Sequence, residues 1–115
     1  MSSAILDRVW LDVCALEDIP LRGARRVGSA SHPVAIFRTG DDEVYALVDR
    51  CPHKRGPLSM GIVHGSSVTC PLHGMRIDLA TGEPMGADAG KGCAPGIGVR
   101  LERGRVLIDA NALSA

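Results

Sequence analysis

The stretch from Cys51 to Gly74, CPHKRGPLSMGIVHGSSVTCPLHG, carries most of the chemistry that this sequence offers. It contains two short boxes, Cys51-Pro52-His53 and Cys70-Pro71-Leu72-His73, which residues 54–69 separate. Each box supplies one thiolate and one imidazole. Structural zinc sites more often take their cysteines from one segment and their histidines from another. The mixed boxes therefore predict a metal centre, and they favour one with two chemically different halves.

A two-iron centre is the metal site that suits this mixture of donors. An all-sulfur [2Fe–2S] centre has a reduction potential of about −400 mV. When imidazoles replace two thiolates on one iron, the reduction potential lies between about −150 and +300 mV. We expect Cys51 and Cys70 to bind one iron, and His53 and His73 to bind the other. A mononuclear Cys₂His₂ zinc site is the alternative. Visible absorption and the EPR signal of the reduced state would separate the two.

The four ligands and their spacing resemble the Rieske family. The likeness extends beyond the boxes, where the sequence is similar to the small subunit of assimilatory NAD(P)H-dependent nitrite reductase. The further residues that carry it are Lys54–Ser59, Gly61-Ile62-Val63, Ile77–Glu83 and Gly92-Cys93. This resemblance implies an all-β fold, a Rieske-type antiparallel sandwich with a cluster-binding subdomain at about residues 50–80. It also implies a [2Fe–2S] cluster whose two imidazole ligands are exposed.

Two departures from related patterns stand at and after the boxes. Gly74 and Met75 occupy a place where these nitrite reductase subunits often have Asp and Trp, and we expect the change to alter the surface near the cluster. Neither box has the extra cysteine of Rieske proteins in cytochrome bc complexes. Met75 also cannot donate the hydrogen bond that a Ser at this place commonly gives to a bridging sulfur. By resemblance, the centre suits ferredoxin-like transfer better than quinol oxidation.

Short strands account for the rest of the chain. Alternating or continuous apolar runs between turn residues predict strands, and no stretch keeps a 3.6-residue apolar period over three turns. Glycine-rich turns join several of these strands into hairpins, and Gly86–Gly96 is expected to be a loop. The expected strands are Val9–Cys14, Val34–Thr39, Glu43–Val48, Gly61–His64, Ser67–Thr69, Arg76–Leu79, Gly98–Glu102 and Arg105–Asp109.

Length and charge limit the classes that remain. A chain of 115 residues fits one domain, and we expect a single Rieske domain over residues 1–115. Lys and Arg total 13 and Asp and Glu total 13, so the balance argues against nucleic-acid binding. No run approaches the roughly 20 apolar residues of a membrane span, and the N-terminus lacks the features of a signal peptide. We therefore expect a cytoplasmic protein without a membrane partner.

The remaining candidate residues have ordinary interpretations. Cys14 is expected to be a buried apolar side chain, Cys93 is either buried or exposed, and Trp10 is expected in the core. Lys54 and Arg55 either dock on an acidic partner or form a solvated tip. His32 and His64 are expected to be surface or turn residues.

These observations lead to three hypotheses about function. The first is the electron-transfer small subunit of an NAD(P)H-dependent nitrite reductase, whose large subunit carries flavin and sirohaem. The second is the Rieske ferredoxin of an aromatic-ring-hydroxylating dioxygenase or related oxygenase, served by a ferredoxin reductase. The third is a structural subunit whose cluster only holds its loops. The sequence shows no nucleotide-binding motif, so we expect no catalysis by this chain alone.

Overall fold

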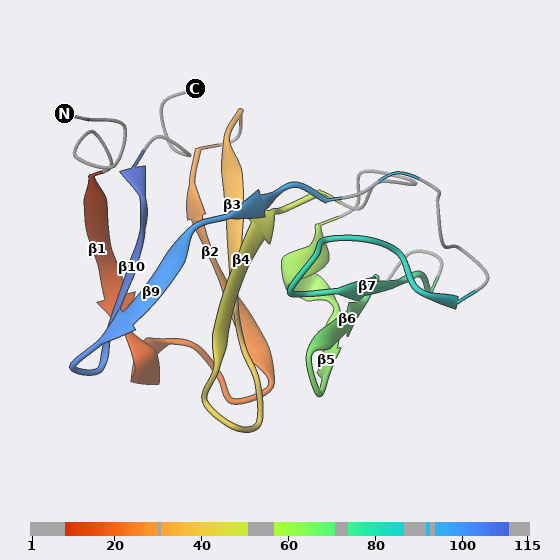
Figure 1. The fold of residues 1–115 in the computed structure, drawn as a ribbon, viewed down its shortest axis with the longest axis horizontal. Helices are drawn as coiled ribbons and strands as arrows, with labels where there is room; N and C mark the ends of the chain where they lie inside the picture. Colours follow the sequence, from red (N-terminus) through yellow and green to blue (C-terminus); the bar gives the residue numbers. More distant parts are fainter. Residues whose placement is uncertain are drawn as a thin grey trace, which may run out of the picture.

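The structure, a computed structural model, describes residues 9–29, 31–50, 57–70, 74–86, 92 and 94–110. Within them the strands form three antiparallel sheets, with the orders β1-β10-β9, β2-β3-β4-β8 and β5-β6-β7 (Figure 1). Two single-turn 3₁₀ helices, η1 and η2, accompany them. The elements are β1 (Trp10–Ala15), η1 (Leu16–Asp18), β2 (Gly23–Gly28), β3 (Pro33–Arg38), β4 (Val44–Val48), η2 (Leu58–Met60), β5 (Ile62–His64), β6 (Ser67–Thr69), β7 (Arg76–Asp78), β8 (Gly96–Ile97), β9 (Val99–Glu102) and β10 (Arg105–Asp109).

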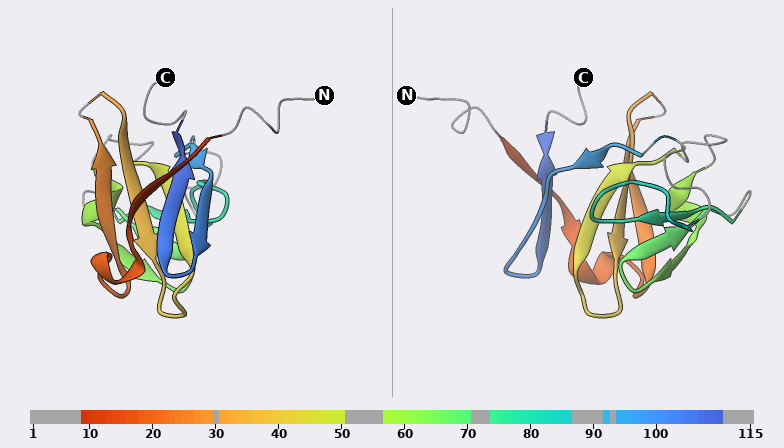
Figure 2. Two further views of the ribbon diagram at one scale, coloured as in Figure 1. Left: turned by 90° about the vertical axis from the view of Figure 1, so that its left-hand side faces the viewer. Right: turned by 45° about the vertical axis from the view of Figure 1, so that its right-hand side comes forward.

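The sheet that contains β3 lies between the other two. Figures 1 and 2 show β1, β9 and β10 on one side of it and β5, β6 and β7 on the other. Val34 and Ile36 belong to one buried apolar cluster, whereas Ala35 and Phe37 belong to a second. Successive side chains of a strand point to opposite faces, so β3 supplies both cores at once. This explains its continuous apolar run, which is typical of a strand buried on both faces.

The two cores divide the structure into layers. The first core joins β1 and β10 to the central sheet and contains Cys14, Ile19, Val106 and Ile108. The second joins the central sheet to β5, β6 and β7. Its buried members are Ala35, Phe37, Leu47, Leu58, Val63, Val68, Cys70, Met75, Ile77, Leu79 and Ala94. The all-β class and the Rieske-type sandwich expected from the sequence are confirmed.

The predicted hairpins are present. Val34 pairs with Val48 across β3 and β4, Val63 pairs with Val68 across β5 and β6, and β9 returns to β10 through Arg103-Gly104. Each of these hairpins joins neighbours in the chain through a short turn. Local patterns are therefore enough to predict them.

Two strands were missed by the sequence patterns. β2 was not expected, because Gly23, Arg25, Arg26 and Gly28 give it little apolar content; it pairs with β3 along its whole length. β8 lies partly within the stretch expected to be a loop, and there Gly96 pairs with Leu47. The loop prediction is therefore wrong at Gly96, where backbone pairing with β4 needs no side-chain pattern.

Trp10 was expected in the core and is instead only partly buried. It belongs to neither core cluster, and the Arg100 guanidinium lies 5.2 Å from its ring centroid. The first strand exposes Leu11 and Asp12 and buries only Cys14 fully, so the start of β1 lies at the surface. Cys14 is buried as expected, with 3% exposure. In the described residues no helix has the length and apolar character that crossing a membrane requires.

Candidate metal centre

One of the four predicted ligands falls within the described residues. Cys70 follows β6 directly and is 1% exposed. Cys51, His53 and His73 lie outside the described residues, as do Lys54, Arg55 and Cys93. Among the described residues no group of three or more His, Cys, Asp or Glu side chains is arranged to hold a metal.

The base of the second box is a backbone turn. The Cys70 N–H donates to the Met75 carbonyl at 2.7 Å, and the Gly74 N–H donates to the Cys70 carbonyl at 3.0 Å. Gly74 has φ of +71°, a conformation that a residue with a Cβ adopts only at a cost. These bonds return the chain from β6 to β7 within six positions, and Cys70 is a buried member of the second core.

The residues that flank both boxes pack together. Leu47 precedes the first box and Leu58 follows it, while Cys70 begins the second and Met75 follows it. All four belong to the same buried cluster. The bases of the two predicted loops therefore converge on one core, as a centre with one ligand pair from each box requires. A buried thiol beside an apolar core also fits a cluster whose sulfur ligands are shielded from water.

Met75 corrects one expectation. The sequence comparison placed the Gly74-Met75 departure at the surface, but Met75 is only 2% exposed and lies in the second core. Gly74 is exposed, in line with the expectation. Methionine fills irregular apolar space well, so the substitution changes packing under the second box.

A buried polar group at the first box was missed by the sequence analysis. Asp49 stands between β4 and Cys51, and its side chain is 0% exposed. Its Oδ1 accepts the backbone N–H of Ser59 at 2.7 Å and its Oδ2 accepts the Ser59 hydroxyl at 2.6 Å. Arg26 Nε lies 3.3 Å from Oδ2. The sequence signal for this group is an acidic residue at the end of an apolar strand, two positions before the predicted ligand Cys51.

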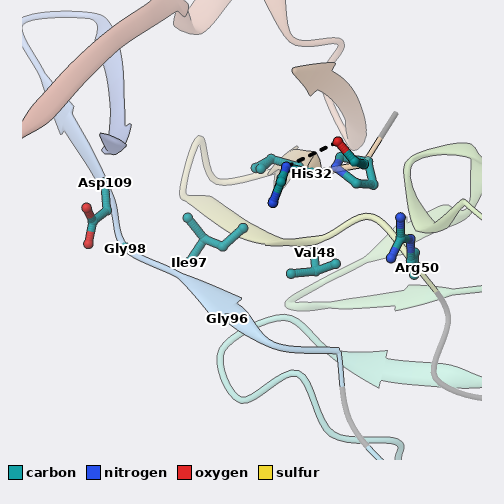
Figure 3. Close-up of a pocket in the computed structure, with 10 residues that line it drawn as sticks. His32, Val48, Arg50, Gly96, Ile97, Gly98 and Asp109 are labelled. Carbon is teal, nitrogen blue, oxygen red and sulfur yellow. Dashed lines mark hydrogen bonds between the residues drawn. The ribbon is translucent and has the colours of Figure 1, made fainter. Parts of the chain in front are cut away.

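A cavity of about 490 Å³ lies beside the start of the first box. Residues from the segment before β3, the end of β4 and the region of β8 line it, and Figure 3 shows His32, Val48, Arg50 and Ile97 around it. Arg50 directly precedes Cys51. The His32 Nδ1 is hydrogen-bonded to the Ser31 hydroxyl at 3.3 Å, in keeping with the expected turn position of His32.

The other described cysteine is separate from this region. Cys14 lies in the first core, whereas Cys70 lies in the second. Burial raises the pKa of the Cys14 thiol above its ordinary value. An apolar, protonated thiol on the far side of the central sheet has no part in the predicted centre.

Three small antiparallel sheets surround two apolar cores, and the residues that flank both boxes, a buried cysteine among them, share one of these cores. This arrangement defines a small all-β domain suited to holding a metal cluster. The sequence profile of the Rieske [2Fe–2S] domain matches residues 9–95, which is most of the chain. The protein therefore belongs to the Rieske family, and its cofactor is a Rieske-type [2Fe–2S] cluster.

Among its relatives, ferredoxin CarAc of Metapseudomonas resinovorans is 39% identical over 82 residues, which are 69% of this chain and 74% of that protein. A chain in the complex of reduced oxygenase and oxidized ferredoxin in carbazole 1,9a-dioxygenase superposes with a TM-score of 0.76 at 32% identity, covering 90% of this chain and 94% of that one. A nitrite reductase NADPH small-subunit oxidoreductase protein superposes with a TM-score of 0.74 at 26% identity, covering 87% and 97%. The family and these relatives make the protein a Rieske-type electron carrier.

Proposed function

We propose that Cys51, His53, Cys70 and His73 hold the cluster, the two cysteines on one iron and the two histidines on the other. The observation that carries this proposal is the convergence of Leu47, Leu58, Cys70 and Met75, the residues at the bases of both boxes, on one core. The ligand set follows the spacing of the boxes. The domain then spans residues 1–115, with the cluster-binding subdomain at about residues 50–80.

The cysteine and histidine ligands have different roles at the site. When bound, the cluster takes up and releases one electron at a time. Cys70, buried in the second core, keeps its sulfur away from water, and the apolar side chains of that core keep the surroundings dry. His53 and His73 form the exposed edge, through which a docked partner exchanges electrons. The chain itself then binds a redox partner and carries out no catalysis alone.

The proposed partners are a ferredoxin reductase and a terminal oxygenase. The relatives support this choice, because one is a ferredoxin and another is a chain from an oxygenase–ferredoxin complex. The second candidate is the small subunit of an NAD(P)H-dependent nitrite reductase, with a large flavin and sirohaem subunit as its partner. The 26% identity to a protein of that description, over 97% of its length, supports it. Both assignments place the protein in the cytoplasm, where NAD(P)H is available.

Two buried cysteines provide a test of the ligand set. We expect Cys70→Ala to lose the visible absorption and the reduced-state EPR signal of a Rieske centre, and Cys14→Ala to retain both. The two variants remove the same atom from the two cores, so general loss of packing affects them alike. A Cys70→Ala protein with an intact Rieske spectrum would refute the ligand set, and a colourless wild-type protein with stoichiometric zinc would refute the cluster.

The partner is tested by electron flow. We expect the reduced protein to restore substrate-dependent oxygen consumption when it is mixed with a ferredoxin-dependent terminal oxygenase and its reductase. Co-purification with a large flavoprotein, and NAD(P)H-dependent nitrite reduction by that complex, would instead establish the nitrite reductase assignment. A His73→Cys variant with a shifted potential and unchanged partner activity would leave the cluster a structural role only.

A further inference from the structure

The buried carboxylate of Asp49 links the two ends of the first box. Asp49 lies before residues 50–58 and Ser59 lies after them, so the two hydrogen bonds to Ser59 close the segment that contains Cys51 and His53. The Asp49 N–H also donates to the Pro33 carbonyl at 3.0 Å, which fixes the carboxylate to the central sheet. Both ends of the predicted ligand loop are thus held by one residue.

Burial alone would favour an apolar side chain at position 49 rather than a carboxylate. An isolated buried carboxylate is strongly destabilising, and pairing it often only offsets that cost. An apolar side chain of similar size would fill the same space without a charge to compensate. Asp49 is compensated by the N–H and hydroxyl of Ser59 and by Arg26, which is half exposed at 51%. Hydrogen bonds to a carboxylate are stronger and more directional than those to neutral groups, so Ser59 is held in one orientation.

The ends of the second box are held in a different way. They are held by backbone hydrogen bonds between Cys70, Gly74 and Met75. The first segment is longer and contains residues 50–58, and its ends are joined through the Asp49 side chain. Arg26 adds a link from β2 to the same carboxylate. Asp49 is thus tied to two strands of the central sheet, to β2 by its carboxylate and to β3 by its backbone N–H.

We propose that Asp49 is a positioning residue for the cluster, with Ser59 as its fixed partner and Arg26 as its compensating charge. This inference rests on the proposed ligand set. Asp49 holds the first loop so that its two ligands meet those of the second box. The carboxylate and the guanidinium also add opposite fixed charges close to the first box, and fixed charge near an iron–sulfur cluster changes its reduction potential.

Opposite charges predict opposite shifts, which a merely structural role would not produce. Asp49→Asn keeps an acceptor for the Ser59 N–H but removes the negative charge, so we expect the midpoint potential to rise. Arg26→Gln leaves the carboxylate less compensated, so we expect the potential to fall. Both potentials are measured by redox titration of the cluster-loaded protein, with the EPR spectrum recorded for each variant.

Ser59→Ala tests the geometry with the charge retained. It removes the hydroxyl donor, and we expect chelator to remove iron about tenfold faster, in line with the loss of one hydrogen bond to a charged group. Ser59→Thr restores a hydroxyl and should return the rate toward that of the wild-type protein. Asp42→Asn is the matched control, because Asp42 pairs with Arg38 at the opposite end of the β3–β4 hairpin.

The outcomes separate this inference from the proposed function. Shifts of opposite sign for Asp49→Asn and Arg26→Gln, with no shift for Asp42→Asn, support it. Shifts of the same sign, or no larger than that of Asp42→Asn, overturn it while the Rieske spectrum stands. If Asp49→Asn does not hold the cluster, Arg26→Gln decides, since an unchanged potential contradicts the proposal. A wild-type protein without a Rieske spectrum refutes the proposed function itself.

Discussion

The carbonyl oxygen of Ala94 lies too close to the position of a Cβ on Gly82 for both atoms to fit. The two residues are joined by a hydrogen bond from the Ala94 N–H to the Gly82 carbonyl at 2.7 Å, and Gly82 has φ of +77°. Ala94 is buried in the second core, together with Leu47 and Ile77. The contact therefore fastens the segment after β7 to the chain that enters β8, at the second core.

Gly82→Ala should be one of the most damaging small substitutions in the chain. The new methyl group both overlaps the Ala94 carbonyl and strains a left-handed backbone, and we expect a loss of about 3 kcal/mol in the free energy of unfolding. Gly104→Ala is the control, because Gly104 has φ of +78° and open space where its Cβ would lie. Gly104→Ala should cost only about 1 kcal/mol. Equal losses in urea unfolding would show that the Ala94 contact is unimportant.

The Cys14 thiol should be unreactive in the folded protein. Its thiol is 3% exposed and burial raises its pKa, so little thiolate is present and reagents cannot reach it. We expect iodoacetamide at pH 8 to leave the Cys14 peptide unmodified in native protein and to alkylate it in urea, as followed by mass spectrometry. Rapid alkylation under native conditions would contradict the packing of β1 on the central sheet.

The pair formed by Asp12 and Arg105 should give stability that depends on pH. Arg105 donates to both carboxylate oxygens of Asp12, at 2.8 to 3.1 Å, and these hydrogen bonds lower the Asp12 pKa from its ordinary 3.8. A lowered carboxyl pKa stabilises the folded state above the ordinary value, and that contribution is lost as the pH falls through the folded-state pKa.

The measurement compares Asp12→Asn with the wild-type protein in urea at several pH values. The wild-type protein should be slightly more stable near neutral pH, and the difference should shrink as the pH falls below 3.8. Both side chains are exposed, so the difference should also shrink in 1 M salt. A difference that stays constant between pH 2 and pH 7 would assign it to something other than this ion pair.

Removal of the cluster should affect one layer of the protein more than the others. β5, β6 and β7 have three residues each, and a sheet this small is marginal without further support. We expect chelator-treated protein to lose hydrogen-exchange protection at Val63, Val68 and Ile77. Val106 and Ile108 in β10 should keep theirs, because the first core has no part in the predicted centre. Equal loss in both layers would mean that the cluster supports the whole fold.

Much of the fold could be predicted from local patterns. The β3–β4, β5–β6 and β9–β10 hairpins follow from apolar runs and intervening turn residues, because such strands pair with their neighbours in sequence. β2 and β8 could not be found this way. β2 is polar and bounded by glycines, and β8 has two residues, so only pairing with strands already in place reveals them.

The predicted centre divides in the same way. The ligand types and spacing of Cys51, His53, Cys70 and His73 predict a Rieske cluster, and the family match confirms that cofactor while the ligand set stays a prediction. The predicted positions of Met75, at the surface, and of Trp10, in the core, were wrong. A side chain's burial depends on what the fold brings against it, and the sequence around these two residues does not specify that.

By itself, then, the sequence determined the class of fold and the kind of cofactor, because hairpin patterning and donor spacing are local properties of the chain. The tertiary structure alone decided that Asp49 meets Ser59 and Arg26, that Ala94 closes over Gly82, and that β3 serves two cores. These contacts join different segments of the chain, and each buried polar group finds its partner only once the sheets have packed.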